Sequence, residues 1–421
     1  MSARSAGNGA LVFLFIAVLV DSIGFGIILP VLPGLIMQLT GVSIDRAAVY
    51  GGRLSFVYAV MQFFCAPVLG NLSDHFGRRP VLLFALLALG CDYFVMGFAP
   101  VIGWLFVGRA VAGVAGASFT PAYAYVADIT PPERRAQTFG LMGAAFGIGF
   151  IVGPAVGGLL GTLLGPRAPF FTAGTIALAN VTLGYFALPE SLPRESRRAF
   201  HWARANPLGT LAQVRRYPVV LLMLGALFLW QLAHQVLPST WAFYTISRFH
   251  WTSAQVGWSL AWVGLVMAIA QGVLTRVLIP WLGGARRAAI AGMSAAVIAY
   301  LGYAFASAGW MMYLFSLTTF IFALTFPSMN ALLSQQIPAD AQGELQGAVA
   351  CVYSLSLIVG PPLMTQVFGY FSAPDAPLQF PGAAFLSAAV LTVGCATLFT
   401  RALRRQAAHA AAQLPAPTPG S

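Results

Sequence analysis

The chain has 421 residues, of which 59% are hydrophobic and only 8% are charged. A soluble globular protein of this length needs many more polar and charged side chains on its surface, so the composition excludes that class and indicates a membrane protein with many spans. The formal net charge of +11 comes from arginine without any lysine. Most of these arginines fall in loops expected on one side of the membrane, and by the positive-inside rule that side is the cytoplasm. The positive charge therefore reflects membrane topology and does not indicate a nucleic-acid partner.

Twelve apolar runs are long enough to cross a bilayer, which takes about 20 helical residues. The first six are expected near 10–37, 50–70, 81–99, 102–127, 136–161 and 168–188, and the second six near 219–243, 255–280, 288–306, 309–333, 345–371 and 380–400. The first run contains Asp21 and follows a single arginine, Arg4, so it predicts a retained spanning helix and not a cleaved signal. The predicted fold class is therefore an all-α membrane protein with twelve transmembrane helices.

A short polar connection, residues 70–80, joins the second and third runs. It contains Asp74 and two arginines, Arg78 and Arg79, while Gly77 permits a tight reversal and Pro80 suits the first turn of a helix. Asp74 is placed to accept hydrogen bonds from the helix start or from the arginines. The segment resembles the signature loop between the second and third helices of the major facilitator superfamily.

The two sets of runs are copies of each other. Ile151-Val152-Gly153-Pro154 recurs as Ile358-Val359-Gly360-Pro361, and other matches share the same spacing. The superfamily resemblance implies two pseudo-symmetric six-helix bundles with a substrate site near the midplane. We expect an N-terminal bundle at 1–188, a cytoplasmic linker at 189–217, a C-terminal bundle at 218–405 and a disordered tail at 406–421.

The fifth run is rich in glycine, which lets neighbouring helix backbones approach closely. Its pattern resembles the GP-GG signature of proton-coupled drug antiporters, and the residues that carry it are Gly149, Gly153, Pro154, Gly157 and Gly158. Helix packing without any meaning for antiport is the alternative. The second copy has Pro362-Leu363-Met364 where the glycine pair would fall.

Two aspartates and one arginine are expected inside the membrane in the first half of the chain. Asp21 and Asp92 lie within apolar runs, and Arg109 opens the fourth. A carboxylic acid in a low-dielectric environment retains its proton more readily than in water, so both aspartates are candidate proton carriers. The alternatives are structural hydrogen bonds for the aspartates and snorkelling to the interface for Arg109. Asp128, at the end of the fourth run, is the predicted partner of Arg78 or Arg79 in a cytoplasmic ion-pair gate that forms when the transporter faces outward.

Several segments together resemble the tetracycline-efflux (Tet) group of drug:proton antiporters. They include Asp21-Ser22-Ile23-Gly24-Phe25-Gly26, Tyr58-Ala59-Val60-Met61-Gln62, Asp92-Tyr93 and Ala127-Asp128-Ile129-Thr130. The resemblance implies roles in exchange or drug binding for Asp21, Gln62, Asp74, Arg78, Asp92 and Arg109. Two positions depart from the group, because Ala296 replaces its ninth-span aspartate and Met267 its eighth-span histidine.

In the second half, the candidate residues are a histidine, several side-chain amides and two aromatic side chains. His234 can titrate near neutrality and is a candidate proton carrier, with a satisfied polar contact as the alternative. Gln231 and Gln235 flank it, and Gln271, Asn330, Trp241 and Tyr244 are further candidates for the substrate-binding wall or for packing. The four cysteines show neither disulfide nor metal-site spacing, so no metal is expected.

These observations predict a proton-driven antiporter that exports amphipathic drug-like molecules, tetracycline-like ones included, across a bacterial inner membrane. The proton gradient supplies the energy and no cofactor is expected. The expected partners are a small-molecule substrate, protons and membrane lipid, for a monomer with both termini in the cytoplasm. The alternatives are a proton-coupled symporter or facilitator for a metabolite and a non-transporting membrane sensor; an enzyme is not expected.

Overall fold

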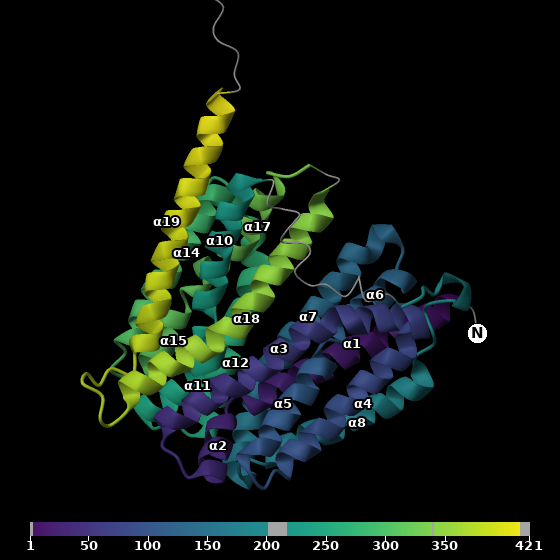
Figure 1. Ribbon diagram of the computed structural model, residues 1–421, viewed down its shortest axis with the longest axis horizontal. Helices are drawn as coiled ribbons and strands as arrows, with labels where there is room; N and C mark the ends of the chain where they lie inside the picture. The colour runs from purple at the N-terminus through teal and green to yellow at the C-terminus, as the bar shows by residue number, and fades with distance from the viewer. Residues whose placement is uncertain (1–2, 201–216, 339–340, 413–421) are drawn as a thin grey trace, which may run out of the picture.

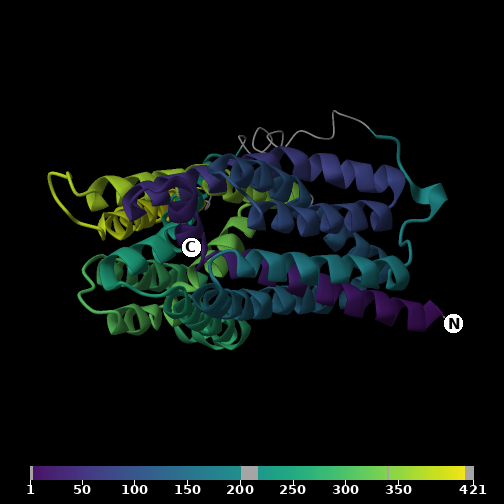
Figure 2. The ribbon, with the colours of Figure 1, turned by 90° about the horizontal axis from the view of Figure 1, so that it is seen from below.

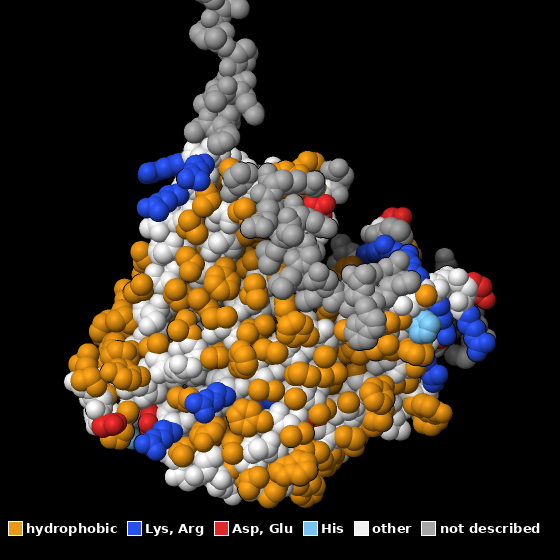
Figure 3. All heavy atoms as spheres, viewed as in Figure 1, with side chains coloured by type: hydrophobic (Ala, Val, Ile, Leu, Met, Phe, Trp, Pro, Cys, Tyr) orange, Lys and Arg blue, Asp and Glu red, His pale blue; other side chains and the backbone are white. Residues whose placement is uncertain are grey.

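The computed structural model describes residues 3–200, 217–338 and 341–412. Within these ranges it contains twelve helical segments that are long and apolar enough to cross a membrane. The predicted all-α fold with twelve spans is therefore confirmed. Hydrophobic side chains cover the middle of the bundle on the face shown in Figure 3, and charged side chains lie mainly toward its ends.

The first half of the chain supplies six spans. Its helices are α1 (Ala3–Ile28), α2 (Leu32–Thr40), α3 (Ile44–Phe76), α4 (Arg78–Gly97), α5 (Ile102–Gly116), α6 (Phe119–Ile129), α7 (Arg135–Leu164) and α8 (Ala168–Ala187). The fourth span combines α5 and α6. Short 3-10 turns follow α6 and α8, at Pro132–Arg134 and Arg194–Ser196.

The second half supplies the other six spans. Its helices are α10 (Pro218–His234), α11 (Val236–Phe249), α12 (Ser253–Ile269), α13 (Thr275–Trp281), α14 (Ala285–Ala304), α15 (Trp310–Ser316), α16 (Thr319–Phe322), α17 (Thr325–Ser334), α18 (Gln342–Ser372) and α19 (Ala383–Ala412). A π-helical turn, Ala270–Leu274, joins α12 to α13 within one span.

Two expected boundaries are wrong. The first run is not one helix to residue 37, because α1 ends at Ile28 and α2 begins at Leu32. Pro30 lies in the break, where its missing N–H cannot continue a helical ladder. The expected disordered tail is also wrong for residues 406–412, since α19 continues to Ala412 through an alanine-rich stretch with high helix propensity.

The helices form two groups that correspond to the halves of the chain, purple to blue and green to yellow in Figures 1 and 2. The groups meet mainly through two helix pairs, α7 with α12 and α3 with α18. We call the end of the bundle that contains the α3–α4 loop and residues 189–198 the linker end. The other end, which contains α2 and the α11–α12 turn, is the distal end.

Close contacts between the halves extend from the middle of the bundle to the distal end. A methyl group added to Gly158 of α7 would lie 3.0 Å from the Gly257 Cα of α12, and the Ala254 N–H donates to Thr162 Oγ1 at 2.9 Å. On the other seam, a methyl group at Gly369 of α18 would lie 2.9 Å from the Asp45 carbonyl oxygen. The two helix groups diverge toward the linker end (Figure 1).

Candidate functional site

Arg78, the first residue of α4, is the centre of an ion-pair cluster at the linker end. Its guanidinium pairs with Asp74 of α3, and its Nε donates to Asp128 Oδ2 of α6 at 3.2 Å. Its Nη1 also donates to Ser73 Oγ at 2.7 Å. The Arg78 side chain is only 12% exposed, so solvent screens these contacts incompletely. Three of the four predicted gate residues therefore meet.

Arg79 makes different contacts. Its Nη2 donates to the Tyr185 carbonyl oxygen of α8, and its guanidinium carbon lies 5.5 Å from the centroid of the Tyr185 ring. These contacts join α4 to α8. The structure thus pairs one arginine of the loop, not both, with the acidic residues.

The cluster does not depend on contact between the two halves. Asp74, Arg78 and Asp128 are already paired although the halves are packed together at the distal end. The reason is that all three residues belong to the first half. Their pairing therefore does not require the linker ends of the two halves to approach each other.

Glu190 is a member of this region that the sequence analysis missed. Its Oε1 accepts the backbone N–H of Arg78 at 2.9 Å and that of Leu192 at 3.0 Å, while Oε2 lies 3.9 Å from Arg197 Nη2. A carboxylate at the start of α4 is favoured by the free N–H groups and by the helix dipole. Pro189-Glu190-Ser191 directly after an apolar run was the available signal, but the partner lies more than a hundred residues away in the sequence.

The beginning of the expected linker is held on the same surface. Ser191 Oγ donates to Asp128 Oδ2 at 3.0 Å, and the Arg198 N–H donates to the Asp74 carbonyl oxygen at 3.0 Å. Tyr125 Oη donates to the Pro189 carbonyl oxygen at 2.6 Å. Residues 189–198 thus form part of the first-half surface, whereas residues 201–216 of the linker lie outside the described residues.

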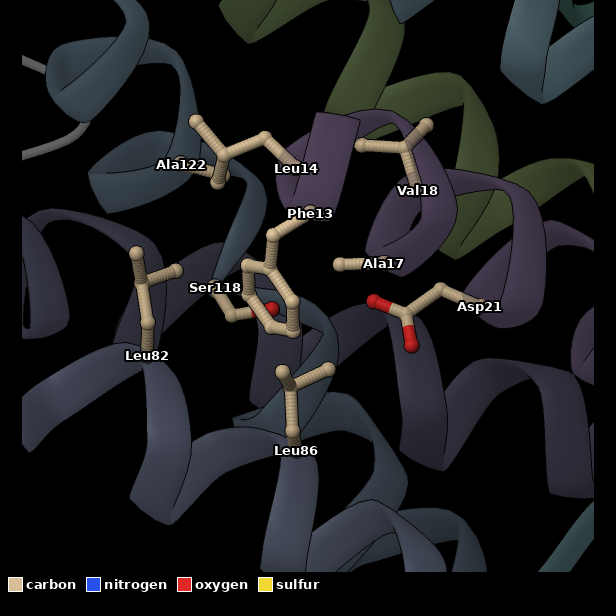
Figure 4. A pocket seen from close by; sticks show the side chains of 9 residues that line it. All are labelled: Phe13, Leu14, Ala17, Val18, Asp21, Leu82, Leu86, Ser118 and Ala122. Carbon is tan, nitrogen blue, oxygen red and sulfur yellow. The ribbon is translucent and has the colours of Figure 1, made fainter. Parts of the chain in front are cut away.

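Asp21 lies in the C-terminal third of α1 beside a small cavity (Figure 4). The cavity measures about 20 Å³, room for about one water molecule. Apart from Asp21, its lining is apolar except for the Ser118 hydroxyl; the apolar members are Phe13, Leu14, Ala17, Val18, Leu82, Leu86 and Ala122. Asp21 Oδ1 is buried and makes no hydrogen bond within the described residues.

Asp92 of α4 is only 2% exposed, and neither of its carboxylate oxygens has a hydrogen-bond partner among the described residues. It lies against α5, because a methyl group added to Gly108 would lie 2.6 Å from Asp92 Oδ1. Arg109 interacts electrostatically with this carboxylate. Ionising a buried carboxylate without hydrogen bonds is unfavourable unless a cation or water reaches it, which suits a group that exchanges a proton.

Arg109 is embedded within the first half. Its Nη2 lies 3.2 Å from Met96 Sδ, and its guanidinium carbon lies 5.9 Å from the centroid of the Tyr58 ring. Gln62 Nε2 in turn donates to Tyr58 Oη and to the Gly116 carbonyl oxygen, both at 3.3 Å. The predicted residues Gln62 and Arg109 are therefore joined through Tyr58, which the sequence analysis used only as part of a resemblance.

Tyr93 connects the two aspartate regions. Its side chain is 3% exposed and lies between α4 and α1. The hydroxyl lies where a methyl group on Gly24 of α1 would be, close to Asp21 in the sequence. Its position directly after Asp92 was the only sequence signal for this role.

The second half holds the remaining proton-coupling candidate, His234, at the end of α10. Its ring centroid lies 5.3 Å from that of Phe322, and its Nδ1 is buried without a hydrogen-bond partner among the described residues. The flanking Gln231 and Gln235 are 7% and 4% exposed. His234 therefore belongs to a different helix group from Asp21 and Asp92.

The other residues predicted to bind substrate lie in separate parts of the second half. Trp241 donates to Ser259 Oγ at 2.9 Å and Tyr244 to the Tyr303 carbonyl oxygen at 2.7 Å, and both are buried in the second-half core. Trp241 also borders an inter-half cavity of about 40 Å³ near the distal end. Gln271 is exposed in the π-helical turn, while Asn330 of α17 has a buried Oδ1 without a partner among the described residues.

The glycine motif of α7 serves two helix contacts. Gly149, Gly153 and Gly157 face α1, where added methyl groups would meet Ser22, Ile23 and Ile27. Gly158 faces Gly257 of α12, and the Pro154 carbonyl oxygen lies against the same glycine. The motif thus joins α7 to a helix of its own half and to one of the other half.

Comparisons with known proteins agree with this architecture. Residues 14–361 match the family model described as the Major Facilitator Superfamily. The chain is 39% identical over 361 residues, 86% of its length and 90% of the relative's, to the class C tetracycline resistance protein of Escherichia coli. It is 37% identical to the class G protein of Vibrio anguillarum, covering 83% of the chain and 87% of the relative.

A solved structure shows the same fold. The crystal structure of a bacterial homolog of the human lysosomal transporter Spinster, in an inward-facing and unoccupied conformation, superposes with a TM-score of 0.77. The sequences are 14% identical, and the match covers 95% of this chain and 97% of the other.

Proposed function

Because the chain belongs to the major facilitator superfamily, among the tetracycline resistance proteins, we propose that it is a proton-coupled antiporter that exports amphipathic drug-like molecules. The observation that carries the proposal is a pair of aspartates in the spans: Asp21 Oδ1 and both carboxylate oxygens of Asp92 are buried without a hydrogen-bond partner among the described residues. Tetracycline-like molecules are included among the proposed substrates.

In the proposed cycle, Asp21 and Asp92 carry protons, and Arg109 attracts the ionised form of Asp92. A proton leaves when water or a cationic substrate reaches the carboxylate. Tyr58 lies beside the Arg109 guanidinium and Tyr93 lies against Gly24 of the helix that carries Asp21, while His234 assists from the second half. The proton gradient supplies the energy for the proposed cycle, and the cycle uses no cofactor.

The linker end is proposed to face the cytoplasm of a bacterial cell, with the chain in the inner membrane and both termini cytoplasmic. The arginine bias supports this orientation. On this orientation, the conformation packed at the distal end is open toward the cytoplasm. The protein is proposed to act as a monomer.

The test is expression in a bacterial host that lacks its own drug pumps. We expect raised resistance to a subset of amphipathic drugs, and an uncoupler that collapses the proton gradient should abolish it. Raised uptake of a metabolite with protons would instead support the symporter, and an unchanged phenotype with normal membrane insertion would support the sensor.

A further inference from the structure

The two halves carry equivalent loops at the linker end of the bundle. Gly77 precedes α4 with a φ of 108°, and Gly284, which lies 207 residues later, precedes α14 with a φ of 104°. The same spacing separates the repeated Ile-Val-Gly-Pro motifs of the two halves. Each glycine is followed by an arginine pair, Arg78–Arg79 at the start of α4 and Arg286–Arg287 at the start of α14. We call residues 281–287 the second loop.

The acids that surround the first arginine pair have no counterparts around the second. In the first half, Asp74 and Asp128 form ion pairs with the first arginine of the loop. The positions 207 residues after these aspartates are Trp281 and Gln335. Among the described residues, no ion pair joins Arg286–Arg287 to an acidic side chain. The second loop thus carries the arginines without the carboxylates that balance them in the first half.

The second loop lies at the membrane surface. Val273, Val277 and Trp281 follow one another at four-residue spacing and are 60%, 60% and 78% exposed. Helical residues at this spacing lie on one side, so these three form an apolar stripe that faces the lipid and ends at the second loop. Tryptophan is enriched at the level of the lipid headgroups, because its ring is amphipathic. Trp281 therefore places the adjoining arginines at headgroup depth.

Three exposed arginines lie in or beside the second loop. Arg276 precedes the loop on α13, and Arg286 and Arg287 lie in the first turn of α14. A methyl group added to Gly283 would lie 2.9 Å from Arg287 Nη1, so this guanidinium folds back over the loop. We call Arg276, Arg286 and Arg287 the arginine surface.

The surroundings of the arginine surface add further positive charge. α14 packs against α19, whose exposed Arg401 and Arg404 lie at the same end of the bundle. Figure 3 shows basic side chains gathered beside this end of α19. Glu344, the acid that the described residues of the second half contribute at this end, begins α18, which packs mainly against α3. An anion from outside the chain is therefore the complement that the arginine surface lacks.

We infer that the arginine surface binds the phosphate of an anionic phospholipid in the adjoining leaflet. Guanidinium groups bind phosphate oxygens through two parallel hydrogen bonds, and basic side chains near a membrane attract acidic lipid headgroups. The lipid phosphate supplies the negative charge that Asp74 and Asp128 supply in the first half. The apolar stripe favours a lipid over a soluble anion, because the acyl chains of the lipid contact the stripe when its phosphate reaches the arginines. This lipid site goes beyond the proposed function and is separate from the exported molecule.

The experiment measures binding of a tail-labelled phosphatidylglycerol to the detergent-purified full-length protein by fluorescence anisotropy. Phosphatidylcholine with the same label is the comparison without net charge. The Arg286→Gln, Arg287→Gln double variant removes two charges from the arginine surface. At about fivefold per arginine, we expect it to weaken phosphatidylglycerol binding about 25-fold and to change phosphatidylcholine binding less than about twofold.

The matched control is the Arg46→Gln, Arg53→Gln double variant, which removes two exposed arginines from the distal end of α3. It changes the net charge by the same amount and should retain both affinities within about twofold. Unchanged phosphatidylglycerol binding by the second-loop variant, or equal weakening by the control, would overturn the inference.

A further variant tests the comparison between the two loops without removing any arginine. Trp281→Asp places a carboxylate at the position equivalent to Asp74, where it should compete with the lipid phosphate for the guanidinium groups. We expect it to weaken phosphatidylglycerol binding about tenfold, whereas Trp281→Asn, which also lacks the indole ring, should weaken it less than about threefold. Similar binding by the two variants would show that unbalanced arginine charge does not hold the lipid.

Inorganic phosphate distinguishes a lipid site from a site for a soluble anion. It should leave most of the labelled phosphatidylglycerol bound at equal ionic strength, because it lacks acyl chains to contact α13. Displacement of the lipid by phosphate, but not by chloride at the same ionic strength, would assign the arginines to a soluble anion and overturn the inference. These measurements need no proton gradient, so their outcome does not depend on whether the protein is an antiporter.

Discussion

The two halves of the molecule share one fold but differ in chemistry. The first half contains Asp21 and the buried Asp92, the embedded Arg109 and the Asp74–Arg78–Asp128 cluster. In the second half, the buried polar side chains of the described residues are amides and hydroxyls, and His234 is the titratable group that the sequence singled out. Position 296, where the Tet resemblance implies an aspartate, is the fully buried Ala296.

This difference indicates that two halves with the same fold need not carry the same ionisable residues. Protons can be exchanged in one half if the other half responds through contact at the seam. The seam provides that contact through backbone-to-backbone packing of α7 with α12 and of α3 with α18. A change of charge in the first half can then alter the relative position of the halves, although no acid of the second half is buried among the described residues.

The largest expected effect comes from removing a first-half carboxylate. Asp92→Asn should reduce gradient-driven export about 100-fold or more, because the amide cannot exchange a proton. Transport in inverted vesicles provides the measurement, with membrane insertion checked by immunoblot. Asp375→Asn, an exposed loop residue of the second half, is the control and should retain parental activity.

The next effect concerns the seam. Gly158→Val should slow export about tenfold, because the new side chain would meet the Ser253 carbonyl oxygen and Gly257 across the interface. Gly143→Val is matched on the same helix, where an added methyl group has nothing within 4 Å. Similar transport rates in the two variants would show that close approach of α7 and α12 is dispensable.

Variants of the linker-end cluster should have a smaller effect. Asp74→Asn and Glu190→Gln should each slow export about threefold to tenfold and leave folding intact, because partly exposed charged contacts contribute modestly. Glu195→Gln, an exposed residue of the nearby 3-10 turn, is the control. If Glu190→Gln transports as fast as Glu195→Gln does, Glu190 has no role in positioning Arg78.

The smallest effect is expected in the second half. His234→Gln should change the export rate by no more than about threefold, since the proposed exchange depends on the first-half acids. Rates measured from pH 6 to pH 8 provide the check. A loss as large as that of Asp92→Asn would place an essential proton step in the second half and remove the contrast between the halves.

The features that the sequence predicted depend on local pattern. The apolar runs predicted twelve spans because each helix must cover the bilayer thickness by itself. The meeting of Asp74 with Arg78 followed from four-residue spacing across a short loop. Pro30 was visible in the first run, but the expected span continued through the break that it causes.

The features that the sequence did not predict depend on tertiary packing. Glu190 reaches the start of α4 from the end of α8, and Tyr93 reaches α1 from α4. The rings of Phe25 and Phe150 stack although these residues are distant in sequence, and only the packing of α1 on α7 brings them together. Residue type alone gave no reason to choose these rings among the 32 phenylalanines of the chain.

Exchange by the Asp21→Asn, Asp92→Asn double variant in proteoliposomes tests most directly whether coupling depends on the first-half carboxylates. A pH-sensitive dye inside the vesicles reports proton movement when a substrate gradient is imposed, and substrate uptake is measured under an imposed pH gradient. We predict that the variant inserts and folds as the parent does but couples neither movement to the other. Exchange of protons for substrate at the parental rate would contradict the carboxylate mechanism and direct attention to His234.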